Sequence, residues 1–186
     1  LLMAPGRLRV LSLNMLHDIP RFEALSDRLD AIADEILRTD ADIVCLQEVP
    51  WTLRHGNAAR LLAERLGLNY LYLRANGNRW AITFEEGEAI LSRYPLKDVR
   101  FVELAPQASL FQHRVVLGAT ASTPSGELKV FVTHLSHDNP EANSGQAASL
   151  MDFVEVKSQY AGRDQWLNPA LFNVQNTTLA ANGTEP

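Results

Sequence analysis

An apolar run that ends on a carboxylate constrains the fold of this chain more than any other stretch. Residues Ile43 to Leu46 follow one another without polar alternation, which is typical of a strand buried on both faces. Glu48 comes directly after this run. A carboxylate at the end of a buried strand is unfavourable unless an arginine pairs with it or a cation coordinates it. Both partners remain open for Glu48 at this point.

A strand and a helix precede this buried strand. Residues Leu8 to Asn14 are rich in apolar side chains and predict a first strand that ends at Asn14. Residues 27–38 carry apolar side chains at helical spacing and predict an amphipathic helix. The order strand, helix, strand predicts a layered α/β fold. If the two strands are parallel neighbours, Asn14 and Glu48 lie at the same sheet edge, where sites in such folds are built.

Two polar stretches between these elements are interpreted as loops. Residues 15–26 contain Pro20, His17 and Asp18, and a histidine beside an aspartate in a loop is more often a surface pair than a ligand pair. Residues 74–80 are interpreted as a turn-rich loop that either faces the substrate or is a solvated hairpin tip. Further elements are predicted as helices over 57–66 and 145–156 and strands over 70–73, 89–91 and 99–104.

A β-hairpin is predicted around the turn residues 123–126. Residues 114–120 and 127–134 flank this turn as two strand-like runs. Arg114 opens the first run and His134 closes the second, so antiparallel pairing brings both to one end of the hairpin. A guanidinium and an imidazole placed together suit a phosphate oxyanion.

Composition and charge narrow the classes of function. The chain has 186 residues and a formal net charge of −5, which predicts one domain and argues against avid binding to nucleic acid. The single cysteine, Cys45, excludes an intrachain disulfide. No apolar run is long enough to cross a bilayer, and the start of the chain lacks the pattern of a secretory signal, so a cytoplasmic location is expected. No oligomeric state is predicted.

Several motifs occur together in one order, and the set resembles the endonuclease/exonuclease/phosphatase superfamily, the DNase I-like metal-dependent phosphoesterases. The resemblance covers roughly residues 7 to 156. Its motifs are the strand that ends in Asn14, the strand that ends in Gln47-Glu48, the phrase Ala89-Ile90-Leu91-Ser92-Arg93-Tyr94-Pro95, Arg114, and Val132-Thr133-His134-Leu135.

The resemblance implies a fold, a cofactor and roles for four residues. The fold would be a four-layered α-β-β-α sandwich. Glu48 would coordinate Mg²⁺ or Mn²⁺, and Asn14 would orient the attacking water or help to hold the metal network. His134 would donate to a phosphate oxygen, and Arg114 would neutralise charge that grows during attack.

Two motifs of the superfamily are missing. The Gly-Asp-x-Asn motif has its nearest match at residues 173–176, where Val174 replaces the aspartate, and the Ser-Asp-His motif has no match. Residues 136–138 contain serine, histidine and aspartate in another order and are interpreted as a loop. The chain is therefore expected to hold the N-terminal part of one domain, residues 7–186, truncated or divergent after about residue 157. One sheet would then lack its partner and expose apolar surface.

Two functions follow as hypotheses. The first is a metal-dependent phosphoesterase that hydrolyses a phosphodiester or phosphomonoester by attack of an activated water. Its substrate would be a small molecule or a lipid headgroup rather than nucleic acid, although a nuclease activity stays open. The alternative is a catalytically inactive fragment or a binding and assembly module derived from the same fold.

Overall fold

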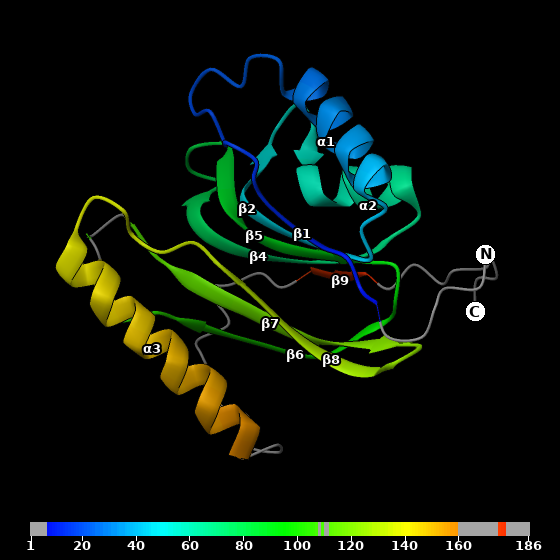
Figure 1. Ribbon diagram of the computed structural model, residues 1–186. Coiled ribbons are helices and arrows are strands. Elements are labelled where there is room, and N and C mark those ends of the chain that lie inside the picture. The colour runs from blue at the N-terminus through cyan, green and yellow to red at the C-terminus, as the bar shows by residue number, and fades with distance from the viewer. Residues whose placement is uncertain (1–6, 108, 110–111, 160–174, 178–186) are drawn as a thin grey trace.

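Two β-sheets packed face to face form the centre of the protein, and helices cover the outer face of each sheet (Figure 1). The computed structural model describes residues 7–107, 109, 112–159 and 175–177. The predicted α/β class with two sheets is confirmed. None of the helices in the described part of the chain is long and apolar enough to cross a membrane.

The first sheet holds the buried run and the strand that ends at Asn14. Its strands, in spatial order, are β1 (Val10–Asn14), β2 (Ile43–Thr52), β5 (Phe84–Ser92), β4 (Asn69–Asn78) and β9 (Gln175–Thr177), and the short β3 (Gly56–Asn57) pairs with β2. β1 and β2 are parallel, with Asn14 opposite Gln47. The prediction that Asn14 and Glu48 reach the same sheet edge is therefore confirmed.

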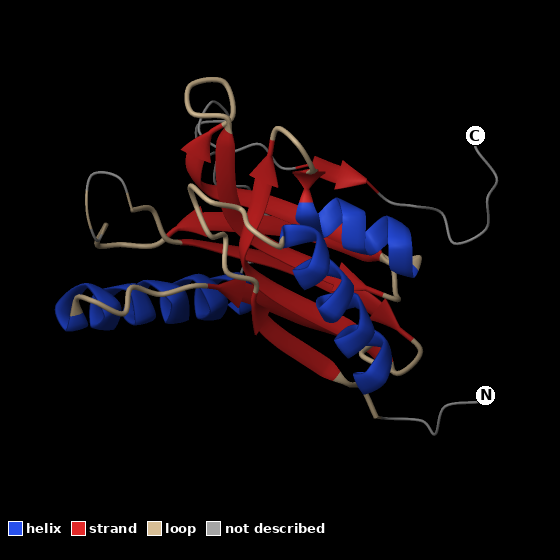
Figure 2. Ribbon diagram, turned by 90° about the horizontal axis from the view of Figure 1, so that it is seen from above, coloured by secondary structure: helices blue, strands red, loops and turns tan. Residues whose placement is uncertain are grey.

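Helices α1 (Leu25–Thr39) and α2 (Ala58–Leu66) cover the outer face of this sheet (Figures 1 and 2). The apolar stripe of α1 includes Ile32, Ala33 and Ile36, all buried against the sheet. The sequence fixes the ends of α2 by capping. The side chain of Asn57 accepts a hydrogen bond from the backbone N–H of Arg60 at 3.0 Å, and Gly67 follows the helix in the left-handed conformation.

The second sheet comes from the middle of the chain and covers the inner face of the first. It consists of β6 (Leu96–Glu103), β7 (Val115–Thr123) and β8 (Gly126–Thr133), with β7 central. Helix α3 (Pro140–Gln159) covers its outer face (Figure 1). The core between the sheets consists of buried apolar side chains, which include Ile43, Leu71, Ile90, Val115, Leu117 and Val132.

The expectation that one sheet would lack its partner is wrong for the described residues. The hairpin predicted around residues 123–126 forms β7 and β8, and β6 adds a third strand to them. These three strands pack on Cys45 and the other inner side chains of the first sheet. Burial raises the pKa of the Cys45 thiol to about 11, with a smaller effect from Glu88, as expected for a small buried side chain.

Three segments predicted as loops or as strand ends belong to longer strands. β2 continues past Glu48 to Thr52, β4 includes residues 74–78, and β5 begins at Phe84. These extensions are rich in polar side chains and therefore lack the apolar signal of a strand. Val174, in the nearest match to the Gly-Asp-x-Asn motif, lies outside the described residues, whereas residues 175–177 pair with β4 as β9.

Gly87 offers a test of this packing. A Cβ atom added at Gly87 would lie 1.9 Å from the backbone carbonyl oxygen of Leu73. We expect Gly87→Ala to lower the free energy of unfolding by about 3 kcal/mol or more, because the clash is with backbone. Chemical denaturation followed by circular dichroism measures this change.

Gly67→Ala is the matched control. Gly67 has a positive φ but no atom within 4 Å of an added Cβ, so we expect a loss of only about 1 to 2 kcal/mol from the left-handed backbone. Equal losses in the two variants would contradict the close approach of β4 and β5.

Candidate functional site

A β-bulge in β2 brings Glu48 out of the sheet. The pairing between β2 and β5 shifts register between Leu46 and Val49, and Glu48 has a φ of 53°, which is uncommon for a residue other than glycine. Leu46 and Val49 both face the helix-covered core although they are three residues apart. In a regular strand Glu48 would share the face of Leu46 and be buried under the helices.

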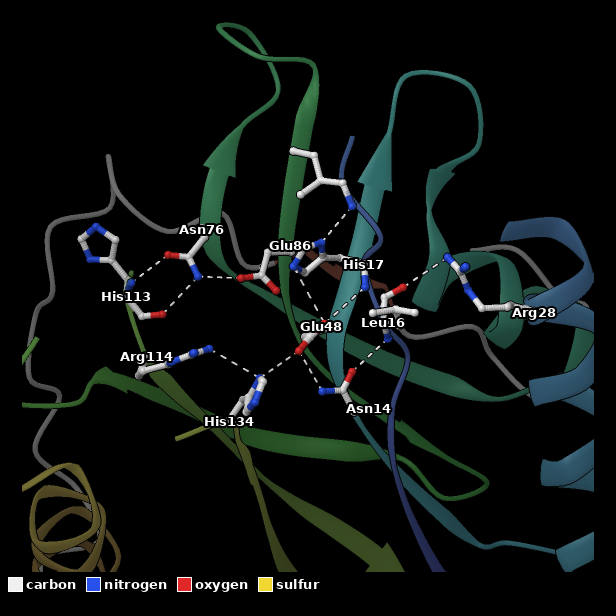
Figure 3. Close-up of polar contacts among 11 residues, drawn as sticks. Asn14, Leu16, His17, Arg28, Glu48, Asn76, Glu86, His113, Arg114 and His134 are labelled. Carbon is white, nitrogen blue, oxygen red and sulfur yellow. Dashed lines mark hydrogen bonds and ion pairs between the residues drawn. The ribbon is translucent and has the colours of Figure 1, made fainter. Parts of the chain in front are cut away.

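The carboxylate of Glu48 is the centre of a polar cluster at this edge (Figure 3). Its Oε1 accepts a hydrogen bond from Asn14 Nδ2 at 2.8 Å and lies 3.6 Å from His134 Nδ1. Its Oε2 accepts a hydrogen bond from the backbone N–H of His17 at 3.3 Å. Asn14 is itself oriented, because its Oδ1 accepts a hydrogen bond from the backbone N–H of Leu16 at 2.9 Å.

The surroundings of Glu48 favour its ionised form. Burial alone would raise the pKa of Glu48. Hydrogen bonds from Asn14 and from the backbone of His17 outweigh this effect, with help from the nearby imidazoles of His17 and His134, and the pKa lies below its ordinary value. Glu48 is therefore an anion at neutral pH. Its contribution to stability is present above the ordinary carboxyl pKa and is lost as the pH falls through the lowered value.

Arg114 and His134 come from the second sheet. Arg114 immediately precedes β7 and His134 immediately follows β8, and Arg114 Nη1 lies 3.5 Å from His134 Nδ1. The prediction that these two residues share one end of the hairpin is confirmed. Burial and the charge of Arg114 lower the pKa of His134, with partial compensation from Glu48 and Glu86. The imidazole is therefore neutral at pH 7.

The structure brings together all four residues that the sequence singled out, Asn14, Glu48, Arg114 and His134 (Figure 3). The two sheets contribute two residues each, so the site lies at one end of the sandwich. This placement agrees with the prediction that the four residues form one site. The chemical roles that the resemblance implies for the four residues stay predictions.

His17 is a residue that the sequence interpretation placed at the surface. Instead, its backbone N–H contacts Glu48, and its Nε2 lies 3.9 Å from Glu48 Oε2. Asp18, its predicted partner, lies 3.6 Å from Arg28. The loop after β1 has no periodic pattern, so only its position next to Asn14 in the sequence could have indicated that His17 belongs to the site.

The sequence interpretation did not single out a second group of residues near the site, of which Asn76 lies in a segment interpreted as a loop. Asn76 Nδ2 donates a hydrogen bond to Glu86 Oε1 at 2.6 Å. The Oδ1 of Asn76 accepts one from the backbone N–H of His113 at 2.7 Å, which joins β4 to the second sheet. His113 Nδ1 lies 2.6 Å from Glu103 Oε1. The alternation of Glu86, Glu88 and Ile90 on one face of β5 was the available signal.

Glu88 follows Glu86 by two residues on β5 and is almost completely buried, with 3% of its surface exposed. Burial, Glu86 and Glu48 raise its pKa well above the ordinary value, and Arg114 opposes this shift. Its Oε2 and the Nε of Arg114 are both buried and have no hydrogen-bond partner among the described residues. Burial therefore disfavours the ionised form of Glu88, and the positive charge of Arg114 opposes this effect.

The oxygen donors of the site fit a hard cation in part. Glu48 supplies an ionised carboxylate and Asn14 supplies an amide, which are ligand types that Mg²⁺ and Mn²⁺ accept. Among the described residues, no group of three or more histidine, cysteine, aspartate or glutamate side chains has the arrangement of a metal site. This donor set suits an ion that keeps most of its water, as Mg²⁺ does when one or two carboxylates hold it.

Comparison with known proteins identifies the family. The model of the endonuclease/exonuclease/phosphatase family matches residues 11–165. The chain belongs to this family. The matched segment includes all or part of every element from β1 to α3. All four residues predicted for the site lie within it. A search of curated protein sequences finds no significant match.

Several solved structures have the same fold. The catalytic domain of human Nocturnin with a bound sulfate anion matches with a TM-score of 0.65 and 23% identity, over 83% of this chain and 60% of that chain. A family protein from Leptotrichia buccalis matches with a TM-score of 0.63 and 18% identity, over 81% and 63%. TDP2 from Caenorhabditis elegans matches with a TM-score of 0.59 and 22% identity, over 84% and 47%. The chain therefore spans about half to two thirds of these proteins.

The lowered pKa of His134 provides a test of the site. Arg114→Met removes a charge that disfavours imidazolium, so we expect the pKa of His134 to rise toward the ordinary histidine value. Arg114→Lys keeps the charge and should leave the pKa depressed. NMR titration of the imidazole Cε1–H resonance measures both.

The sign of the pH dependence follows from the same shift. Between the lowered pKa and the ordinary value the unfolded chain binds more protons, so His134 reduces stability as the pH falls through this window. Arg114→Met should weaken this pH dependence. An unchanged His134 titration in Arg114→Met would show that the guanidinium does not act on the imidazole.

Proposed function

We propose that this chain carries the metal-binding and phosphate-binding part of a phosphoesterase site in a DNase I-like α-β-β-α domain that includes residues 7–186. The observation that supports this most strongly is the position of Glu48. The β-bulge turns an ionised carboxylate out of a buried strand, toward Asn14 and His134. Family membership supports the same proposal, because endonuclease/exonuclease/phosphatase proteins are typically Mg²⁺-dependent phosphoesterases.

Glu48 and Asn14 would hold the divalent cation in this proposal. A bound Mg²⁺ or Mn²⁺ supplies Lewis-acid polarisation of a phosphoryl oxygen and a lowered pKa of coordinated water. Two hydrogen bonds fix the orientation of both side chains before any ligand binds. The backbone N–H of Leu16 donates to Asn14 Oδ1, and Asn14 Nδ2 donates to Glu48. Such preorganisation reduces the reorganisation needed when charge develops.

His134 and Arg114 would bind the phosphoryl group. Nδ1 of His134 lies 3.5 Å from Arg114 Nη1, a donor, and 3.6 Å from Glu48 Oε1, an acceptor. In this proposal the proton is on Nε2, and Nδ1 accepts from Arg114. The Nε2–H group can donate to a phosphate oxygen while the ring stays neutral. The guanidinium of Arg114 is buried and keeps its positive charge close to where negative charge grows on the phosphoryl oxygens.

The substrate class is part of the proposal. A phosphoester of a small molecule or of a lipid headgroup agrees better than nucleic acid with the net charge of −5. A second candidate function is a binding or assembly module without catalysis. It is favoured by Val174 in place of the aspartate in the nearest Gly-Asp-x-Asn match and by the absence, among the described residues, of a group of three metal-ligating side chains.

Metal binding is the first test. We expect Mn²⁺ to bind to the protein in isothermal titration calorimetry and Glu48→Gln to weaken its affinity by about tenfold or more, because the variant loses the charged ligand. Glu64→Gln is the matched control, since Glu64 lies on α2, which covers the outer face of the first sheet, and pairs there with Arg60. Equal affinities in all three proteins would contradict the assignment of Glu48.

Catalysis is tested with bis-p-nitrophenyl phosphate in the presence of Mg²⁺ or Mn²⁺. We expect metal-dependent hydrolysis that falls about a hundredfold or more in Glu48→Gln and in His134→Asn, with no change in Glu64→Gln. Metal binding that depends on Glu48, without hydrolysis in the wild-type protein, would contradict catalysis and support the binding module.

A further inference from the structure

Exposed apolar side chains concentrate at the end of the sandwich that carries the site. Among the described residues, eight large apolar side chains are exposed, and five of them belong to three loops at this end. We call these five residues the apical rim: Leu16, Ile19, Leu53, Trp80 and Ile82. Trp80 is 92% exposed and Leu53 is 75% exposed. Single exposed apolar residues are ordinary, but such a concentration marks an interaction surface.

The strand pairing places the loops of the apical rim side by side. Thr52 at the end of β2 pairs with Phe84 at the start of β5, and Phe84 pairs with Asn78 at the end of β4. The turn that carries Leu53 and the turn that carries Trp80 and Ile82 therefore leave the sheet together. Figure 3 shows both turns extending past the labelled site residues.

The loop after β1 joins this group through aromatic contacts. The ring of Phe84 lies 5.6 Å from the ring of His17 and 5.5 Å from that of Phe22, measured between centroids. The backbone N–H of Ile19 donates to His17 Nδ1 at 3.1 Å. Leu16 and Ile19 are thus held next to the hairpin tips and next to Glu48.

The exposure of Trp80 is imposed by an ordered turn. Asn78 Oδ1 accepts hydrogen bonds from the backbone N–H groups of Trp80 and Ala81 at 2.9 and 3.2 Å. Arg79 points inward, where its guanidinium contacts Glu85 at 2.8 and 3.0 Å and lies 4.8 Å above the ring of Trp51. With Arg79 fixed inward, the side chain of the next residue is directed outward into solvent.

The charges of the two turns indicate the kind of surface they contact. Residues 50–56 and 79–84 include no aspartate or glutamate, in a chain with 22 acidic residues. Arg79 is neutralised by Glu85, so Arg54 is the arginine that these two turns expose. In the third loop of the rim the charge of Asp18 is offset by Arg28, 3.6 Å away. Arg54 is exposed beside Leu53. Apolar and aromatic side chains with basic neighbours, carried on protruding turns, match the interfacial region of a phospholipid bilayer, where tryptophan is enriched and phosphates attract arginine.

We propose that the apical rim docks on a phospholipid surface. Docking would direct the Glu48 end of the sandwich toward the headgroups. The headgroup phosphoester would also be the substrate, and this part rests on the function proposed above. Docking itself requires neither metal nor hydrolysis. Docking at the tips of the turns is reversible, because only a few apolar side chains enter the interface.

Vesicle flotation tests this proposal with the full chain. The probes are metal-free vesicles of phosphatidylcholine mixed with phosphatidylglycerol, and binding is measured as the fraction of protein that floats. We expect the wild-type protein to bind, and Trp80→Ser and Leu53→Ser each to reduce the partition coefficient by about tenfold, as expected for loss of a buried apolar side chain. High salt should weaken binding because the arginine contacts are screened.

Leu37→Ser is the matched control, because Leu37 is 63% exposed but lies on α1, outside the apical rim. Its partition coefficient should equal that of the wild-type protein. Absence of vesicle binding by the folded wild-type protein, or an equal loss in Leu37→Ser and Trp80→Ser, would overturn the proposal. Self-association that is lost in Trp80→Ser, without vesicle binding, would assign the apical rim to a second copy of the chain instead.

Glu48→Gln separates this proposal from the proposed function. The variant should float with vesicles as the wild-type protein does, because Glu48 is not part of the apical rim. Vesicle binding without metal-dependent hydrolysis would leave docking intact and contradict catalysis. Hydrolysis of a soluble phosphodiester without vesicle binding would leave catalysis intact and contradict docking.

Discussion

The β-bulge at Gln47 and Glu48 is the constraint on which the rest of the site depends. β2 is an interior strand of its sheet and is apolar on both faces, so a regular continuation would bury the Glu48 carboxylate against aliphatic side chains. The extra residue moves Val49 onto the helix-covered face and turns Glu48 toward the sheet edge. The positive φ of Glu48 is unfavourable by itself and persists because hydrogen bonds and packing on both sides hold it.

The apolar parts of the fold could be predicted from the sequence, and the polar strand ends could not. The run Ile43 to Leu46 and the periodic stretch in α1 carry their own signal, since each buries a continuous apolar face. The ends of β4 and β5 are stabilised by contacts between residues distant in sequence, such as Asn76 with His113 and Arg79 with Glu85. No local pattern encodes such pairs, so these strand ends were interpreted as loops.

The site residues, too, could be predicted only where they end or open a strand with a clear apolar pattern. Asn14, Glu48, Arg114 and His134 end or open predicted strands, and the direction of those strands was enough to bring Asn14 to Glu48 and Arg114 to His134. Only the resemblance to a known family indicated that the two pairs share one site. His17 reaches Glu48 through a backbone N–H and through the path of an irregular loop, which no side-chain pattern describes. Glu88 was missed for a different reason, because the sequence does not distinguish a buried carboxyl with a raised pKa from a solvated carboxylate.

The site takes its residues from both sheets, and this arrangement couples its geometry to the apolar core between them. Asn14 and Glu48 belong to the first sheet, whereas Arg114 and His134 belong to the second. A fluctuation that slides the second sheet relative to the first would separate the anion-binding groups from the carboxylate while every strand kept its own ladder of hydrogen bonds. Such an opening would leave circular dichroism unchanged and yet disassemble the site, so the integrity of the site reports on the contact between the sheets rather than on either sheet alone.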